Sequence, residues 1–251
     1  FRVPMGGKSY PDPALTGFGL LALQTKPKAL RSAEEQATID KGLHWLLAAP
    51  SGLSIATAER AVWQRSVDVL CASIEICAEL GGKYLVHGSP AQRRVAGPDD
   101  AKRVEEAWAI AADAARQAGV TYCLEPLAAP DCNYINMLAE ASSVVQRIGN
   151  PAFRSMVDTL AASLMEAEPV PEIIRRWMPT GMVAHVQLND RNKKGPGQGS
   201  DRFGPVLQAL SDTGYDGWVA MEPFVYEPDG DRKSTRLNSS HIPLSRMPSS
   251  A

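Results

Sequence analysis

The sequence predicts an α/β fold in which parallel strands alternate with helices around a closed (β/α)8 barrel. Short apolar runs alternate with longer segments of helical periodicity along the 251 residues, and no linker interrupts them. We count seven strand–helix units or partial units, one fewer than a closed barrel contains. An open doubly wound sheet is the alternative, but no Gly-rich phosphate loop follows an early strand. The expectation is therefore a (β/α)8 TIM barrel.

The expected elements follow from apolar periodicity and from turn residues at their ends. Strands are expected at residues 18–23, 43–47, 83–87, 121–125, 155–158, 183–188 and 218–222. Helices are expected at residues 33–40, 58–80, 99–118, 136–148, 170–178 and 203–213. The clearest helix is 99–118, because two aspartates open it, its body is Ala-rich and Gly119 follows its end.

The two ends of the chain differ from the rest. The chain begins with Phe1 rather than Met, and residues 1–28 read poorly as a first unit, so we expect a barrel incomplete at its N-terminus. Residues 231–251 contain six serines and no amphipathic period, and they resemble translated sequencing-adapter DNA. We therefore expect a barrel domain over residues 1–230, followed by a non-native or disordered tail where a normal eighth unit would begin.

Composition excludes several classes of protein. With 44% hydrophobic and 22% charged residues, the chain has the make-up of an ordinary globular domain. The net charge is −2, and without residues 231–251 it is −5, with 22 basic and 27 acidic residues, so no basic surface for nucleic acid is expected. No apolar run approaches the roughly 20 residues of a membrane span. The four cysteines form no CxxC pair, which favours reduced thiols and a cytoplasmic location.

Ionisable residues lie at or near the ends of four consecutive expected strands. They are Glu125, Asp158, His185 and Glu222, separated by about one strand–helix unit each. The carboxyl ends of parallel barrel strands share one face, and neighbouring strands lie about 4.8 Å apart. Three carboxylates brought this close need a counter-charge, because like charges raise one another's pKa. One divalent cation would supply it, and this donor set suits Mn²⁺, with Mg²⁺ or Co²⁺ as alternatives.

Each of these residues also has an ordinary structural explanation. An acidic residue at a strand end commonly caps the next helix or pairs with a lysine, and a lone histidine is more often a core residue than a ligand. The combination of four ligand-type side chains on four successive strands favours the metal site.

The same stretches give the chain a resemblance to a known family. From about residue 42 to 228 it resembles the sugar phosphate isomerase/epimerase family, the xylose-isomerase-like barrels that include ketose 3-epimerases. The matching motifs are GLHWLL (42–47), GGKYLVHGSP (81–90), LEPLAAPDCNYIN (124–136), MVDT (156–159), HVQLNDRNKKGPGQG (185–199) and MEPF (221–224).

The resemblance implies roles for individual residues. One divalent metal, usually Mn²⁺, would be bound by Glu125, Asp158, His185 and Glu222, and the two glutamates would also be the catalytic acid and base. Substrate-binding positions of the family match Asp131 (usually a Glu there), Arg191 and Phe224 in this sequence. One departure is Ala161, where epimerases usually have a substrate-binding histidine, and this puts a free ketohexose substrate in doubt.

Two further histidines are candidates for the substrate pocket. His87 ends the expected strand 83–87, and His44 lies in strand 43–47 beside Trp45. A buried, hydrogen-bonded core position is the alternative for both histidines.

The sequence thus favours a metal-dependent sugar isomerase or epimerase that abstracts a proton next to a carbonyl through an enediolate. Its partner would be a small-molecule sugar or sugar phosphate, with no nucleic acid or membrane, and the protein would form a homodimer or homotetramer. A lyase or dehydratase of the same barrel family, acting on an inosose or cleaving a C-glycoside, is the main alternative. An abasic-site endonuclease is disfavoured by the few histidines and the acidic charge, and a non-catalytic sugar-binding barrel by the four metal-type positions.

Overall fold

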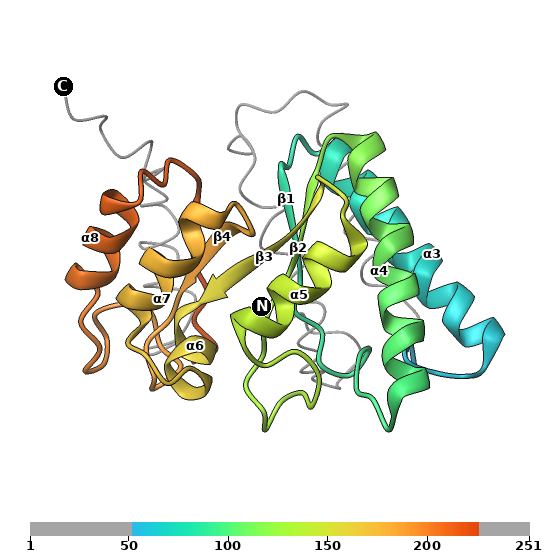
Figure 1. Cartoon of the computed structure of the whole chain (residues 1–251), viewed down its shortest axis with the longest axis horizontal. Helices are drawn as coiled ribbons and strands as arrows, with labels where there is room; N and C mark the ends of the chain where they lie inside the picture. Colours follow the sequence, from blue (N-terminus) through green and yellow to red (C-terminus); the bar gives the residue numbers. More distant parts are fainter. Residues whose placement is uncertain (1–51, 226–251) are drawn as a thin grey trace, which may run out of the picture. The chain divides into compact units, whose positions relative to one another are not determined.

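The computed structural model describes residues 52–225 of the chain, and Figure 1 traces their helices and strands. The strands are β1 (Tyr84–His87), β2 (Thr121–Leu124), β3 (Phe153–Asp158), β4 (Val183–Leu188) and β5 (Val219–Met221). The helices are α3 (Arg60–Glu79), α4 (Pro98–Ala118), α5 (Leu138–Ile148), α6 (Thr159–Met165), α7 (Val170–Trp177) and α8 (Gly204–Asp212), with a 3₁₀ turn η2 (Met178–Thr180).

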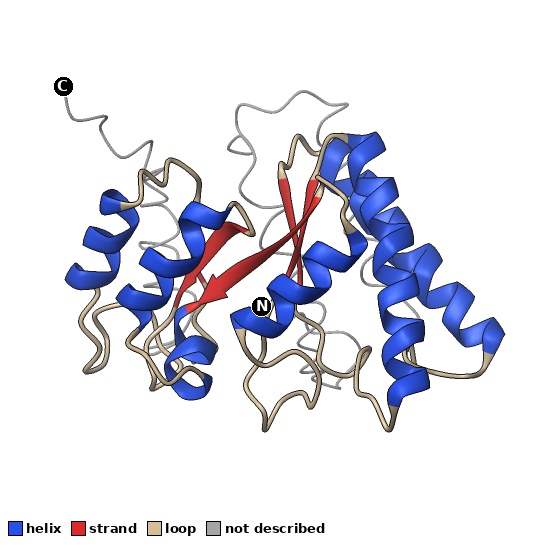
Figure 2. Cartoon of the chain, viewed as in Figure 1, coloured by secondary structure: helices blue, strands red, loops and turns tan. Residues whose placement is uncertain are grey.

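The order of elements confirms the predicted alternation across the described residues (Figure 2). The five strands and five of the helices lie within a few residues of the predicted positions. Helix α6 was not predicted, because seven residues are too few to show a helical period. The expected elements at 18–23, 33–40 and 43–47, and the tail 231–251, lie outside the described residues.

The described chain divides into two compact units. The first runs to Leu124 and also takes in residues 129–134 and 143–154, and the second holds residues 125–128, 135–142 and those from Ser155 onward. Within the first unit β1 and β2 pair in parallel. Within the second unit β3, β4 and β5 are parallel and follow one another in chain order.

The core of the first unit is rich in aromatic side chains. Trp108 of α4 lies 6.2 Å from the ring of Phe153, and Tyr122 of β2 lies 5.8 Å from the same ring. Trp108 belongs to a buried stripe along α4 whose i, i+3, i+4 spacing is that of one helix face. The helix ends where Gly119 adopts a left-handed φ of 69°, the conformation that favours glycine.

The strands of the second unit have two distinct faces. Val157, Val186 and Leu188 pack into an apolar cluster with α7 and α8. The register shifts between β3 and β4, because Ser155 pairs with Val183 while Met156 pairs with His185, and Ala184 is the extra residue of this bulge. Beyond the bulge the strict alternation turns Asp158 and its register partner Gln187 to the face opposite that cluster.

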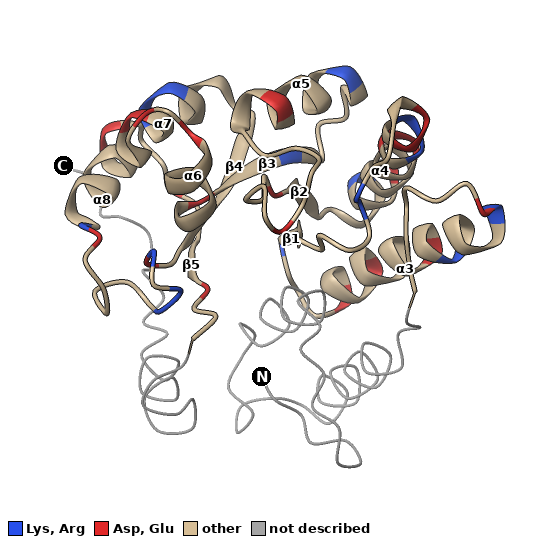
Figure 3. Ribbon diagram, turned by 90° about the horizontal axis from the view of Figure 1, so that it is seen from below, with Lys and Arg blue, Asp and Glu red and all other residues tan. Residues whose placement is uncertain are grey.

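Charge is distributed over the helices without separation by sign. Acidic and basic residues both line α3 and α4 in Figure 3, and i,i+3 pairs such as Lys102–Asp99 and Arg103–Asp100 connect them on α4. Among the residues described, no helix is long and apolar enough to cross a membrane.

A glycine at the turn before β1 offers a test of packing in the first unit. A Cβ on Gly82 would lie 2.6 Å from the Cys77 Sγ and 2.9 Å from its carbonyl oxygen. We expect Gly82→Ala to lower the free energy of unfolding by about 1–3 kcal/mol in a urea titration. Gly204→Ala is the control, since nothing lies within 4 Å of its added Cβ. Equal midpoints for the two variants would contradict the packing described here.

Candidate metal centre

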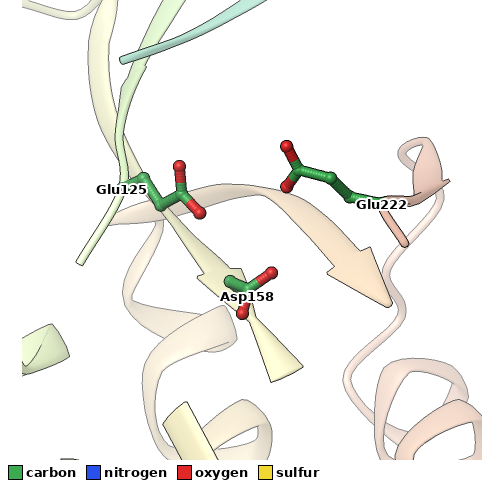
Figure 4. Close-up of side chains that lie close together, drawn as sticks. All are labelled: Glu125, Asp158 and Glu222. Carbon is green, nitrogen blue, oxygen red and sulfur yellow. The ribbon is translucent and has the colours of Figure 1, made fainter. Parts of the chain in front are cut away.

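Three acidic side chains meet at the carboxyl ends of strands. Glu125 directly follows β2, Asp158 is the last residue of β3, and Glu222 directly follows β5. One oxygen from each carboxylate can be chosen so that all three lie within 4.8 Å of one another, and all three residues are buried. In Figure 4, Glu125 and Glu222 extend toward each other from opposite sides, with Asp158 below them. All three belong to the second unit.

The strand register explains why Asp158 and Glu222 share a face. Asp158 pairs with Gln187, and Gln187 pairs with Ala220, so these three residues form one row across the sheet. Glu222 lies two residues beyond Ala220 and therefore on the same face. Its backbone N–H donates to the Leu188 carbonyl at 3.1 Å, which continues the pairing of β4 and β5 to the site.

Asp158 is held by hydrogen bonds at both carboxylate oxygens. Oδ1 accepts from the Ala161 N–H at 2.7 Å, so the side chain caps the N-terminus of α6. Oδ2 accepts from Nδ2 of Asn189 at 2.7 Å. Burial raises the pKa of Asp158 to about 6, although both hydrogen bonds favour the charged form. The Asp158 carboxylate is thus both held in one orientation by hydrogen bonds and removed from water by burial.

The pKa of Glu222 is shifted further than that of Asp158. Burial, and then the charge of Asp158, raise the pKa of Glu222 to about 8. Its Oε2 is buried and has no hydrogen-bond partner among the described residues. Neither Asp158 nor Glu222 forms an ion pair with a cationic side chain in that part of the chain.

This arrangement fits a divalent cation. A cation would remove the repulsion between the two carboxylates and give Glu222 Oε2 the partner that it lacks. Oxygen donors of this kind suit hard ions such as Mg²⁺ or Mn²⁺.

His185 lies within β4, the strand in which the sequence placed it, but it is not level with Asp158. It is buried in β4 and pairs with Met156, two rows before Asp158, so it lies about two strand residues, roughly 6.6 Å, further from the strand end. The group of three carboxylates does not include it. Burial lowers the pKa of His185 to about 4, and a hydrogen bond with the backbone of Trp218 opposes that shift. Its role as a metal ligand stays a prediction.

Gln187 is a residue that the sequence analysis did not select. It is the register partner of Asp158, and its Oε1 is buried with no hydrogen-bond partner among the described residues. The sequence analysis considered only ionisable side chains as ligands, but the oxygen of an amide side chain can also bind a metal. The strand period of two could have indicated Gln187, because it lies two residues after His185, on the same face of the strand and nearer its end.

The candidate substrate residues of the second unit lie nearer the surface. The Arg191 side chain is 61% exposed, and its Nε lies 3.1 Å from Oδ1 of Asp201. Phe224 is 48% exposed, and its N–H donates to the Lys193 carbonyl at 2.8 Å. Ala161 is buried at the start of α6. Substrate contacts by Arg191 and Phe224 stay predictions.

The other candidates divide between the first unit and the region outside the described residues. His87 is buried at the end of β1, where its Nδ1 lies 3.1 Å from Nε1 of Trp108 and 2.5 Å from the Tyr122 hydroxyl. Asp131 is exposed, and its carbonyl accepts from Arg94. His44 lies outside the described residues. The substrate-binding roles of all three stay predictions.

Comparison with known proteins identifies the family. Residues 16–240 match the family model described as the xylose isomerase-like TIM barrel. The chain belongs to this family. The predicted fold class is thereby confirmed, and the described strands and helices are consistent with part of such a barrel.

Sugar epimerases are among the proteins that this family member resembles. The L-ribulose 3-epimerase of Mesorhizobium japonicum is 26% identical over 87% of this chain and 70% of that protein. A solved structure of L-ribulose 3-epimerase has a TM-score of 0.65 and 24% identity, over 85% of this chain and 73% of the other. The D-psicose 3-epimerase structure from Clostridium cellulolyticum H10 has a TM-score of 0.61 and 24% identity, over 69% of this chain but only 61% of its own length.

The raised pKa of Glu222 predicts how pH affects the metal-free protein. A carboxyl group whose pKa rises on folding, here from 4.5 to about 8, contributes stability below its unfolded value that is lost as pH rises through its folded value. We therefore expect the midpoint temperature of the metal-free protein to fall between about pH 5 and pH 8. Glu222→Gln should flatten this dependence in calorimetric scans, and parallel curves for the two proteins would contradict the assignment.

Proposed function

We propose that this protein is a metal-dependent sugar epimerase or isomerase that acts by proton transfer next to a carbonyl, as in ketose 3-epimerases. The observation that carries the proposal is the buried group of Glu125, Asp158 and Glu222 at the carboxyl ends of strands. Active sites of this barrel lie at that face. The epimerase relatives support a sugar as the substrate. The reaction that this chain catalyses on it is what we propose.

The three carboxylates would hold the metal, with Gln187 as a further donor. Gln187 Oε1 is preferred to His185 because Gln187 lies in the same row as Asp158. Mn²⁺ is the metal that we propose. When bound, such an ion supplies positive charge beside the substrate oxygens, where negative charge develops as the proton leaves carbon.

The two glutamates would transfer the proton. Figure 4 shows their carboxylates facing each other, so a sugar held between them would have one glutamate on each face. Epimerisation needs a proton to leave one face of a carbon and return to the other, which this arrangement supplies. The carboxylate of one glutamate would take the proton, and the protonated carboxyl of the other would return one. The raised pKa of Glu222 shows that its environment favours the protonated form before metal binding.

A lyase of the same barrel family would share the metal and the proton abstraction but would expel a leaving group. The products separate the two reactions. Incubation with Mn²⁺ in D₂O and a panel of ketoses, keto-inositols and their phosphates would give an isomer of unchanged formula carrying deuterium at one carbon. Loss of water or of an aglycone, seen by NMR and mass spectrometry, would instead identify the lyase.

The proposed acid–base role predicts the behaviour of Glu222→Gln. We expect this variant to lose at least about 10²-fold in deuterium exchange into the substrate, because an amide cannot transfer the proton. Circular dichroism should show an unchanged fold. Glu172→Gln on α7, whose carboxylate pairs with Arg175 away from the three carboxylates, is the control and should exchange at the wild-type rate. Exchange by Glu222→Gln at the wild-type rate would overturn the role.

The choice of Gln187 over His185 predicts a second contrast. Gln187→Leu keeps the volume of the side chain but removes the donor oxygen, so Mn²⁺ affinity measured by calorimetry should fall by about 10-fold or more. His185→Asn should bind Mn²⁺ within about threefold of wild type. The opposite ranking would restore His185 as the ligand that the sequence suggested.

A further inference from the structure

Asn189 connects the Asp158 carboxylate to the backbone of Glu222. It is the first residue after β4 and is almost completely buried, at 1% exposure. Its Nδ2 donates to Asp158 Oδ2 at 2.7 Å and lies 3.5 Å from the Glu222 carbonyl oxygen. One amide therefore joins the end of β3 to the chain that carries Glu222.

The hydrogen bonds of Asn189 fix the orientation of its amide. The Leu160 N–H can only donate, and it lies 2.8 Å from Oδ1, so the oxygen must face α6. The NH₂ group then faces Asp158 and can only donate to it. The Thr159 hydroxyl adds a contact to Oδ1 at 3.1 Å and accepts from the Asn189 N–H at 3.0 Å. Rotation of the amide would break several of these bonds at once.

The Asn189 NH₂ group donates to Asp158, one of the carboxylates that would bind the metal. The Ala161 N–H at Oδ1 and the Asn189 amide at Oδ2 together hold the Asp158 carboxylate in one orientation. Groups that orient metal ligands in this way commonly change metal affinity 10- to 100-fold when they are removed.

We propose that Asn189 is a positioning residue for the metal site, holding Asp158 in its ligating orientation and linking it to the Glu222 strand. The proposal rests on the proposed function, because it presupposes that the carboxylates bind a divalent cation.

The test compares two variants that break different bonds of Asn189. Asn189→Ala removes the donor to Asp158. Thr159→Val removes the hydroxyl that contacts Asn189 but leaves the amide donor in place, so it is the matched control for lost stability. Each protein is examined by thermal denaturation without metal and by calorimetric titration with Mn²⁺.

We expect Asn189→Ala to weaken Mn²⁺ binding by about 10- to 100-fold and Thr159→Val by no more than about twofold, with both lowering the unfolding midpoint. Should Asn189→Ala fail to fold, Asn189→Ser serves in its place, because its hydroxyl is too short to reach Asp158. Wild-type affinity in the Asn189 variant would overturn the positioning role while leaving the metal site intact. Absence of Mn²⁺ binding by the wild type would overturn the proposed function itself, and the Asn189 role with it.

Discussion

The candidate site of the second unit depends on the burial of three carboxyl groups in one small volume. Oxygens of the three groups lie within 4.8 Å of one another. Burial, and then the nearby charge of Asp158, disfavour the ionisation of Glu222 and raise its pKa to about 8. In the metal-free protein the raised pKa values of Asp158 and Glu222 favour their protonated forms and so reduce the repulsion between the two groups. The divalent cation that we propose would instead balance the ionised carboxylates directly.

The strands of the second unit have two faces, one that is apolar and one that carries the site. Val157, Val186 and Leu188 bury one face against α7 and α8, and this apolar packing fixes the strands. The opposite face is then free to carry polar groups that would not stabilise the fold by themselves. Asp158 also caps α6, so the same side chain that belongs to the site begins the next helix. Folding and site assembly are therefore linked through Asp158.

Much of this could be predicted from the sequence, and the limit lies in the strand register. Apolar runs separated by helical segments predicted β1 to β5, and the rule that parallel strands end at one face brought Glu125, Asp158 and Glu222 together. The sequence could not show the bulge at Ala184 or the depth of each residue along its strand. The side-chain period of a strand is two, so His185 and Gln187 share a face, and only the pairing with β3 shows which is level with Asp158. Asn189 was not selected for a related reason. Its proposed role depends on contacts with Asp158 and Glu222, which come from other strands and which the sequence does not show.

The same burial would couple metal binding to proton release in the proposed site. Glu222 is protonated near neutral pH before the cation arrives, because its pKa lies near 8, and it must lose that proton to become a ligand. Cation affinity should therefore increase with pH until Glu222 ionises unaided. A bound cation would lower the pKa of the same carboxyl group. Burial and a bound cation would thus act on the pKa of Glu222 in opposite directions, burial raising it and the cation lowering it.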